Sequence, residues 1–236
     1  MSKMSYRDQV TGVLNKYKRK SPEDYLVMVP VTDASNTVVG FLHPVTADYR
    51  SSIPNCVDLF SRWREENPTL SLARFQITHQ RTEFWLDHSV ILNDNRIIFL
   101  IEDCQREYIG HIGFANFRYE QRIAEVDSVL RGRKKIHPRI MEYAISALVR
   151  WGKRELGLRQ IDLEVYSENA HAINFYKRCG FSADVLIPLE KEILPDEVRW
   201  NPCADNTKPA EKYYLRMILH EEVNSRGENI SKTQPL

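Results

Sequence analysis

The residues of this chain that are best suited to chemistry lie between positions 125 and 181. A basic cluster carries five positive charges within nine residues: Arg131, Arg133, Lys134, Lys135 and Arg139. It follows a strand-like run and precedes a helical pattern. A helix start offers free N–H groups and the positive end of the helix dipole. The cluster is therefore predicted to bind an anion such as a diphosphate; the alternative is a solvated basic turn.

Two carboxylates precede this cluster on a predicted strand. Glu125 and Asp127 are two residues apart, so an extended strand points both to one face. A partly buried carboxylate there would have a raised pKa and could accept a proton. Alternatively, both face solvent or pair with a cation. His111 and His137 are the other candidate bases, although a lone histidine is more often structural.

A single tyrosine, Tyr176, lies on the apolar stripe of a short predicted helix. Asn169 is a good N-cap for it, and Gly180 is a good C-terminal stop. The stripe repeats at i, i+3, i+4 and i+7: Ala172, Ile173, Tyr176 and Cys179. Taken alone, Tyr176 is predicted to be a buried tyrosine with a satisfied hydroxyl. Cys179 is predicted to be a small core residue.

The surrounding elements follow from hydrophobic periodicity and turn residues. Strands are predicted over Tyr25–Val31, Thr37–Leu42, Arg96–Ile101, Tyr108–Phe117, Arg122–Leu130, Gln160–Tyr166, Phe181–Leu189 and Tyr213–Leu219. Helices are predicted over Ile53–Glu66, Thr78–Ile91, Pro138–Leu156 and Asn169–Phe181. In the strand that carries the carboxylates, Ile123, Glu125, Asp127 and Val129 are expected on one face, and Ala124, Val126, Ser128 and Leu130 on the other.

One main domain is expected, with additions at both ends. Residues 1–22 form a helical segment that is predicted to dock on the domain rather than to anchor in a membrane. The domain spans residues 23–219, with its core at 96–219 and an irregular, proline-containing insertion at 190–210. Residues 220–236 are polar and without periodicity, which predicts a loose tail.

Composition excludes several classes of protein. The chain has 236 residues, 42% of them hydrophobic and 28% charged, which is typical of a globular protein. Lys and Arg number 33 against 32 Asp and Glu, so no global basic field indicates a nucleic acid partner. The four cysteines form no CxxC pair, so we expect no metal site. No apolar run approaches the ~18 residues of a membrane span, and a cytoplasmic location with free thiols is expected.

The order Asn-x-x-Ala-Ile-x-x-Tyr-x-x-x-Gly-Phe, from Asn169 to Phe181, closely resembles a segment of the GNAT (Gcn5-related) N-acyltransferase superfamily. The elements that precede it also fit, so the resemblance covers roughly residues 96–219. It implies an α/β (α+β) fold with a mixed, mostly antiparallel central sheet flanked by helices. That sheet splays open between its fourth and fifth strands, and acyl-CoA lies in the split.

The resemblance also implies roles for particular residues. Tyr176 would be the general acid that protonates the leaving thiolate, and Glu125 or Asp127 would be the general base. Asn169 would bind the pantetheine arm or an ordered water. The pantetheine arm would pair with the backbone of Val129, Leu130 and Arg131, and the backbone N–H near Val129 to Leu130 would polarise the thioester carbonyl. The pyrophosphate would bind at Arg133, Lys134, Lys135, Ile136, His137 and Arg139.

One departure from the family pattern concerns the basic loop. The family usually has two glycines there, and an alignment on Ile136 and Ile140 puts Lys135 and His137 in their places. Glycines let the backbone approach a phosphate closely. Without them, Lys and Arg side chains would replace some backbone contacts, and a relative that does not bind CoA is an alternative.

The resemblance predicts an enzyme that moves an acetyl or short hydroxyacyl group from CoA directly to a primary amine. The acceptor expected first is a nucleotide-linked dideoxy amino sugar, as in the members of this superfamily that act in polysaccharide biosynthesis. A protein, a peptide or another small amine is the alternative acceptor. The other reading is a GNAT-like binding domain without activity. The sequence leaves a homodimer open.

Overall fold

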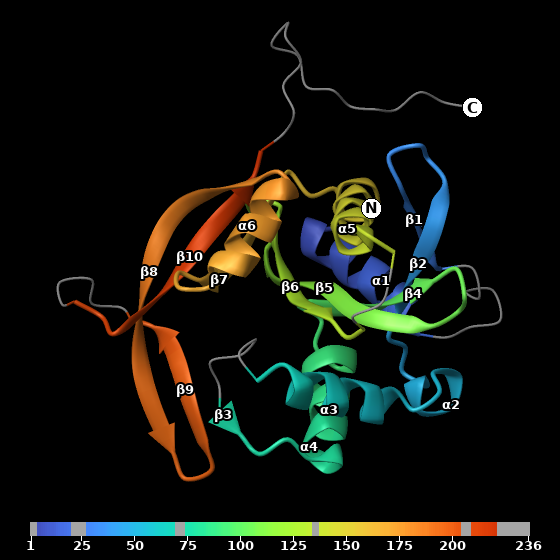
Figure 1. Cartoon of the computed structure of the whole chain (residues 1–236). Helices are drawn as coiled ribbons and strands as arrows, with labels where there is room; N and C mark the ends of the chain where they lie inside the picture. Colours follow the sequence, from blue (N-terminus) through green and yellow to red (C-terminus); the bar gives the residue numbers. More distant parts are fainter. Residues whose placement is uncertain (1–3, 20–26, 69–73, 134–136, 204–208, 221–236) are drawn as a thin grey trace, which may run out of the picture.

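The computed structural model describes residues 4–19, 27–68, 74–133, 137–203 and 209–220 (Figure 1). A single ten-stranded sheet runs through the molecule in the order β1-β2-β4-β5-β6-β7-β10-β8-β9-β3. Its strands are β1 (Val29–Thr32), β2 (Val38–Pro44), β3 (Arg74–Phe75), β4 (Arg96–Asp103), β5 (Tyr108–Arg118), β6 (Ile123–Arg131), β7 (Gln160–Tyr166), β8 (Phe181–Leu194), β9 (Glu197–Pro202) and β10 (Lys212–Leu219). Among these pairs, only β6–β7 is parallel.

The sheet splits where β6 meets β7. The two strands pair only over Ile123–Glu125 and Gln160–Asp162, and beyond these residues their ladder stops. β7 continues by pairing with β10, whereas β6 continues by pairing with β5. The predicted mixed, mostly antiparallel sheet with a splay between these strands is therefore confirmed. Figure 1 shows the two halves of the sheet diverging on either side of α6 (Ala170–Arg178).

A β-bulge interrupts β6 at the split. Asp127 lies opposite Gly113 and Leu130 lies opposite His111, so β6 has one more residue than β5 in this interval. Ser128 is the residue with a left-handed backbone, at φ 55°. The bulge reverses the alternation of side chains that follows it.

The predicted faces of the last two residues of this strand were therefore wrong. Leu130 belongs to the apolar cluster beneath the sheet that holds Phe60 and Trp63. Val129 packs on the opposite side, against the cluster that contains Ala124 and Val126. A period-2 pattern cannot reveal such a shift, because an inserted residue changes the phase without changing the composition.

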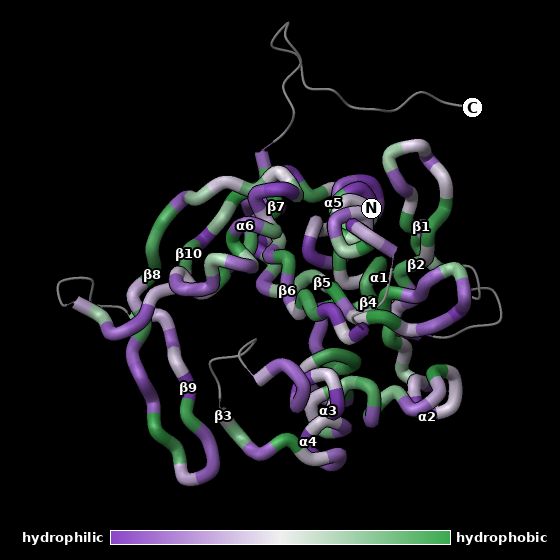
Figure 2. Tube along the Cα trace, in the orientation of Figure 1, coloured by the Kyte–Doolittle hydropathy of each residue, from purple (hydrophilic) through white to green (hydrophobic). Residues whose placement is uncertain are grey.

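Helices cover both faces of the central strands. α1 (Tyr6–Lys18) and α5 (Ile140–Leu156) lie on one face, and α3 (Cys56–Glu66), α4 (His79–Trp85) and the π-helical η1 (Leu86–Ile91) lie on the other. β4 is buried from both sides, with Phe99 facing α5 and Leu100 facing α3. A strand covered on both faces is typically a continuous apolar run. Figure 2 shows the green of hydrophobic residues in the central strands.

The N-terminal helix is part of the apolar core. Val10, Leu14 and Tyr17 of α1 are buried, and the Tyr17 ring meets the Trp151 ring edge to face at 5.0 Å between centroids. This agrees with the expected docking of α1. Within the described residues, no helix combines the length and apolarity needed to cross a bilayer.

The expected irregular insertion at residues 190–210 was wrong over its first half. β8 runs on to Leu194 and turns into β9, and β9 then pairs with β3. Pro195 lies in the turn and Pro202 ends the strand, so neither removes a ladder hydrogen bond from a central position. Residues 204–208 lie outside the described residues. Figure 1 shows the resulting hairpin extending beside α3 and α4.

Other boundaries differ from the prediction by a few residues. The helix predicted over Ile53–Glu66 begins at Cys56 as α3, and a separate short helix, α2 (Tyr49–Ser52), precedes it; the helix predicted over Thr78–Ile91 passes from α4 into the π-helical η1. α5 begins at Ile140 rather than at Pro138, because Arg139 has a left-handed backbone at φ 66°. The tail expected at 220–236 lies outside the described residues beyond His220.

Candidate active site

Two cavities lie on either side of the split and meet at its centre. The first, of about 540 Å³, lies between β5, β6 and β7 and extends to α3 and α4. The second, of about 280 Å³, lies between the end of β6, the start of α5 and α6. Both are lined by Val129, Ala172 and Tyr176. We call them the acceptor-side cavity and the donor-side cavity.

Tyr176 lies where the two cavities meet. Its helix α6 is capped as predicted, because the Asn169 Oδ1 accepts a hydrogen bond from the Ala172 N–H at 3.0 Å. The ring of Tyr176 packs edge to face on Phe181 at 6.1 Å between centroids. In the described part of the chain, the Tyr176 hydroxyl makes no hydrogen bond, contrary to the satisfied hydroxyl expected of a core tyrosine. Burial raises the pKa of Tyr176, so the phenol is protonated at neutral pH and can donate.

Glu125 faces the acceptor-side cavity from β6. Burial raises the pKa of Glu125 to about 7, the hydrogen bond from Asn116 opposes that shift, and the nearby Glu164, Asp127 and Asp162 add to it. The Asn116 Nδ2 donates to Glu125 Oε2 at 2.8 Å. Asn116 is the extra residue of a second bulge, on β5, where it has φ 51°. A carboxyl group with this pKa can take up and release a proton at neutral pH.

Asp127 lies beside Glu125 but is engaged differently. It pairs with Arg96 at 3.2 Å and accepts a hydrogen bond from the Ser128 hydroxyl at 2.9 Å. The Arg96 guanidinium and the Ser128 hydroxyl occupy this carboxylate, so it is less available to an incoming amine than Glu125. The two candidates that the sequence left open are therefore separated by their surroundings.

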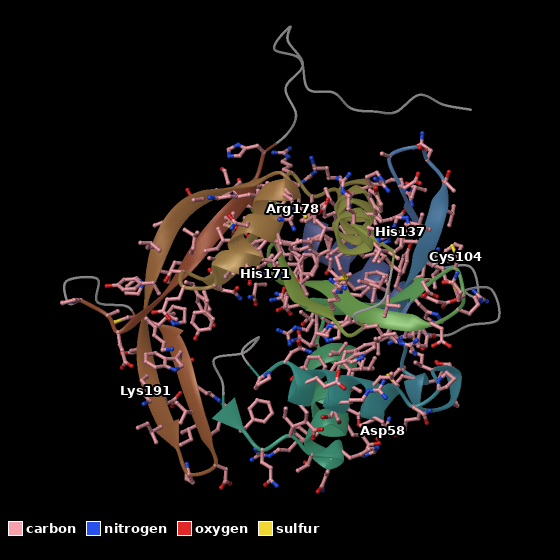
Figure 3. The ribbon with its side chains drawn as sticks, viewed as in Figure 1. Asp58, Cys104, His137, His171, Arg178 and Lys191 are labelled. Atoms are coloured by element: carbon pink, nitrogen blue, oxygen red, sulfur yellow. The ribbon has the colours of Figure 1, made fainter. Side chains whose placement is uncertain are left out.

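The two histidines have different positions. His111 is fully buried, and burial lowers the pKa of its imidazole to about 3. Its Nδ1 lies 2.5 Å from the carbonyl oxygen of the bulged Ser128, so the neutral ring donates there and holds the bulge. His137 instead lines the donor-side cavity, before the start of α5 (Figure 3).

The donor-side cavity contains part of the predicted cofactor-binding set. Arg131, His137 and Arg139 line it together with Val129. Lys134, Lys135 and Ile136 lie outside the described residues. Two predicted residues point elsewhere: Arg133 pairs with Glu107 at 2.6 Å, and Leu130 lines the acceptor-side cavity. Asn169 also lines the acceptor-side cavity.

The sequence reasoning did not consider several residues of the donor-side cavity. His171, Phe175 and Arg178 project from α6, and Figure 3 shows the first and last of these on that helix. Their i, i+4, i+7 spacing places them on one helical face, which was the available signal. Glu142, in the first turn of α5, accepts from Arg139 at 2.7 Å and from Arg178 at 3.1 Å.

The donor-side cavity fits the phosphate-bearing part of acyl-CoA by its chemistry. Guanidinium and imidazole groups surround the start of α5, where N–H groups lack helical partners. The backbone position that would favour glycine in this loop is residue 139, where an arginine has φ 66°. Arg139 thus places a cation at the point where the backbone turns into the helix.

Comparison with known families assigns the chain. Residues 53–182, more than half of its length, match the model of the acetyltransferase (GNAT) domain. The chain therefore belongs to the GNAT family and is an acyl-CoA-dependent N-acyltransferase. GNAT acetyltransferases use acetyl-CoA as the acyl donor. No curated protein matches the sequence significantly.

Solved structures of similar fold include spermidine N-acetyltransferases from Vibrio cholerae. The spermidine/spermine N-acetyltransferase SpeG in complex with manganese ions has 17% identity and a TM-score of 0.52, covering 77% of this chain and 92% of that one. A dodecameric spermidine N-acetyltransferase in an intermediate state has 18% identity and a TM-score of 0.50, covering 73% and 92%. At this identity the similarity supports the fold.

Proposed function

We propose that this enzyme acetylates a primary amine of a small molecule, with attack directly on the thioester of acyl-CoA. The observation that carries the proposal is the junction of the two cavities at Tyr176. A basic cavity of the donor side and a carboxylate-lined cavity of the acceptor side open onto the same phenol. An amine and a thioester bound on opposite sides would meet there.

The proton transfers can be assigned to residues at this junction. The amine is protonated at neutral pH, and Glu125 takes its proton so that the free nitrogen can attack. As the C–N bond forms and the C–S bond breaks, Tyr176 gives its proton to the departing thiolate and regains one from the attacking nitrogen, which loses this second proton to become the neutral amide. The backbone N–H groups near Val129 and Leu130 stabilise the negative charge on the carbonyl oxygen. Val129, Arg131, His137, Arg139 and Arg178 hold the acyl-CoA, which supplies the activated acyl group.

The small-amine alternative has more support than the nucleotide-linked amino sugar that was expected first. The comparisons contain nothing that favours a nucleotide sugar, and the structures of similar fold act on spermidine. Glu125, Asp127 and Glu164 line the acceptor-side cavity, and carboxylates attract an ammonium group. Spermidine is therefore the first polyamine to test, together with small amines of different net charge.

A coupled assay tests the proposal directly. The purified chain is incubated with acetyl-CoA and a panel of small amines, and release of free thiol is followed together with the mass of the acetylated product. We expect turnover with at least one small amine and its loss in Glu125→Gln. Release of thiol only with a protein or peptide acceptor, or with none, would overturn the proposal.

A further inference from the structure

Arg64 of α3 is a cation in the wall of the acceptor-side cavity that lacks a carboxylate partner. Its guanidinium carbon lies 3.9 Å from the centroid of the Trp85 ring, and both side chains line the cavity. Across the residues that the structure describes, the guanidinium makes no ion pair and no hydrogen bond. Its five N–H donors are therefore available to a ligand.

The position of Arg64 is unusual because its charge is partly buried without an ion pair of its own among the described residues. Burial lowers the pKa of Arg64 to about 10, and the nearby Arg96 adds to this effect while Asp127 opposes it. The Asp127 carboxylate is already paired with Arg96. Arg96 itself has a buried Nε without a hydrogen bond partner. Two arginines thus share one carboxylate at this end of the cavity, so its local charge is positive.

The Trp85 ring supports the Arg64 guanidinium from one side. A guanidinium held against an indole ring keeps its edge free, and that edge matches the two oxygens of a carboxylate or a phosphate. The opposite end of the cavity differs in sign. There Glu125 has no ion pair among the described residues, whereas the nearby Glu164 pairs with Arg216 at 2.9 Å, and Asp127 stands close enough to influence both Glu125 and Arg64.

From this arrangement we propose that the natural acceptor is an amine that also carries an anionic group, a carboxylate or a phosphate, which Arg64 binds. The inference rests on the proposed small-amine function and narrows it. The amine of such an acceptor lies toward Glu125 and Tyr176, and its anionic group lies toward Arg64 and Arg96. A polycation that fills the cavity would place one of its charges against these arginines.

The test compares matched acceptors that differ in the anionic group. Tyrosine is paired with tyramine, and glucosamine 6-phosphate with glucosamine, so that the two pairs distinguish a carboxylate from a phosphate; spermidine is the polycationic reference. In the wild type, we expect kcat/KM for the anionic member of at least one pair to exceed that of its partner about tenfold, as a charge-assisted hydrogen bond allows. Spermidine is expected to be the poorest acceptor.

Substitutions of Arg64 test whether this residue binds the anionic group of the acceptor. Arg64→Gln is expected to raise the KM of the anionic acceptor about tenfold, with little change in kcat, in the KM of acetyl-CoA or in the use of the partner that lacks the anionic group. Arg64→Lys keeps the charge without the planar edge. Its KM for the anionic acceptor is expected to lie between those of the wild type and Arg64→Gln. Arg62→Gln, on the exposed side of the same helix, is the matched control and should behave as wild type.

Each outcome decides one of the two proposals. If small amines are acetylated but the anionic members have no advantage, or if Arg64→Gln affects both members of a pair equally, Arg64 is a packing residue and the inference is wrong. If no small amine is acetylated, the proposed function fails. In that case, titration calorimetry of tyrosine and glucosamine 6-phosphate on the wild type and on Arg64→Gln still decides the binding role, because only a ligating arginine gives a difference.

Discussion

The two cavities of this enzyme differ in how their charges are arranged. In the donor-side cavity the arginines come from the end of β6, the start of α5 and α6, and Glu142 pairs with two of them, Arg139 and Arg178. In the acceptor-side cavity Glu125 and Arg64 are both partly buried, and neither has an ion-pair partner among the residues that the structure describes. In the donor-side cavity two of the arginines are paired with a carboxylate, whereas in the acceptor-side cavity Glu125 and Arg64 are separated charges. The separated charges of the acceptor-side cavity suit a ligand that carries a group complementary to each of them. A ligand of the donor-side cavity must instead compete with Glu142 for the arginines.

Removal of the carboxylate at Glu125 is expected to have the largest effect. Glu125→Gln keeps the shape and the hydrogen bond to Asn116 but cannot accept a proton, so kcat should fall about 100-fold, within the range of general-base catalysis. The KM of acetyl-CoA should stay unchanged, because this side chain lines only the acceptor-side cavity. Steady-state kinetics with both substrates varied measures this, and Asp127→Asn is the comparison. A larger loss in Asp127→Asn would move the base to that residue.

Loss of the Tyr176 hydroxyl is expected to have the second-largest effect on kcat. Tyr176→Phe is expected to lower kcat more than about tenfold and to leave acetyl-CoA binding nearly intact, because the ring and its packing on Phe181 remain. Calorimetric titration with CoA beside the rate measurement separates the two effects. An unchanged rate would remove Tyr176 from the proton transfer.

The pH dependence distinguishes the acceptor side from the donor side. The pKa of about 7 at Glu125 predicts that kcat/KM for the amine falls as the pH drops through 7, because the carboxyl becomes protonated. The Glu125→Gln variant should lack this limb in its residual activity. If the limb persists in the variant, another group produces it.

The same raised pKa affects stability in the opposite direction. A carboxyl whose pKa is higher in the folded state favours folding while it is protonated, and this contribution is lost between the unfolded value near 4.5 and the folded value near 7. Above pH 7 the ionised Glu125 destabilises the fold by up to about 3 kcal/mol. Glu125→Gln is therefore expected to raise the Tm at pH 8 and not at pH 4.5, measured by calorimetry. Equal shifts at both pH values would contradict the assigned burial effect.

The smallest effect is expected on the donor side. Glu142→Gln frees Arg139 and Arg178 for the phosphates of the donor, so the KM of acetyl-CoA should fall about two- to fivefold, consistent with the small energies of exposed ion pairs. The KM of the amine should not change. Glu155→Gln breaks the pair with Arg154 at the other end of α5 and is the control. A weaker binding of acetyl-CoA in Glu142→Gln would mean that Glu142 positions the arginines instead.

Much of the fold could be predicted because its signals are local. The continuous apolar run of β4, the alternation of β7 and the caps of α6 each depend on neighbouring residues in the sequence. The segment from Asn169 to Phe181 also identified the family. Tyr176 and Glu125 were found because one lies on a helical stripe and the other on a strand face.

The remaining features depend on contacts between distant segments. The hydrogen bond from His111 to Ser128 and the pairing of Glu142 with Arg178 join residues that are 17 and 36 positions apart. The bulge on β6 leaves no mark in composition, so the faces of Val129 and Leu130 were predicted in the wrong phase. Arg64 resembles any charged residue of an amphipathic helix until Trp85 is seen against it.

The bulge at Ser128 offers a place where β6 can be shortened by one residue. Because Ser128 is the one extra residue opposite β5, its deletion would restore a regular ladder and leave Asp127, Val129 and Leu130 on the faces they now occupy. The acceptor-side cavity would lose the Ser128 hydroxyl that donates to Asp127, together with the peptide carbonyl that accepts from His111, and its other lining side chains would stay. An insertion at the same place would instead turn every following side chain over. Compared with Ser128→Ala, which removes only the hydroxyl, the deletion separates what the backbone of this strand does from what its side chain does.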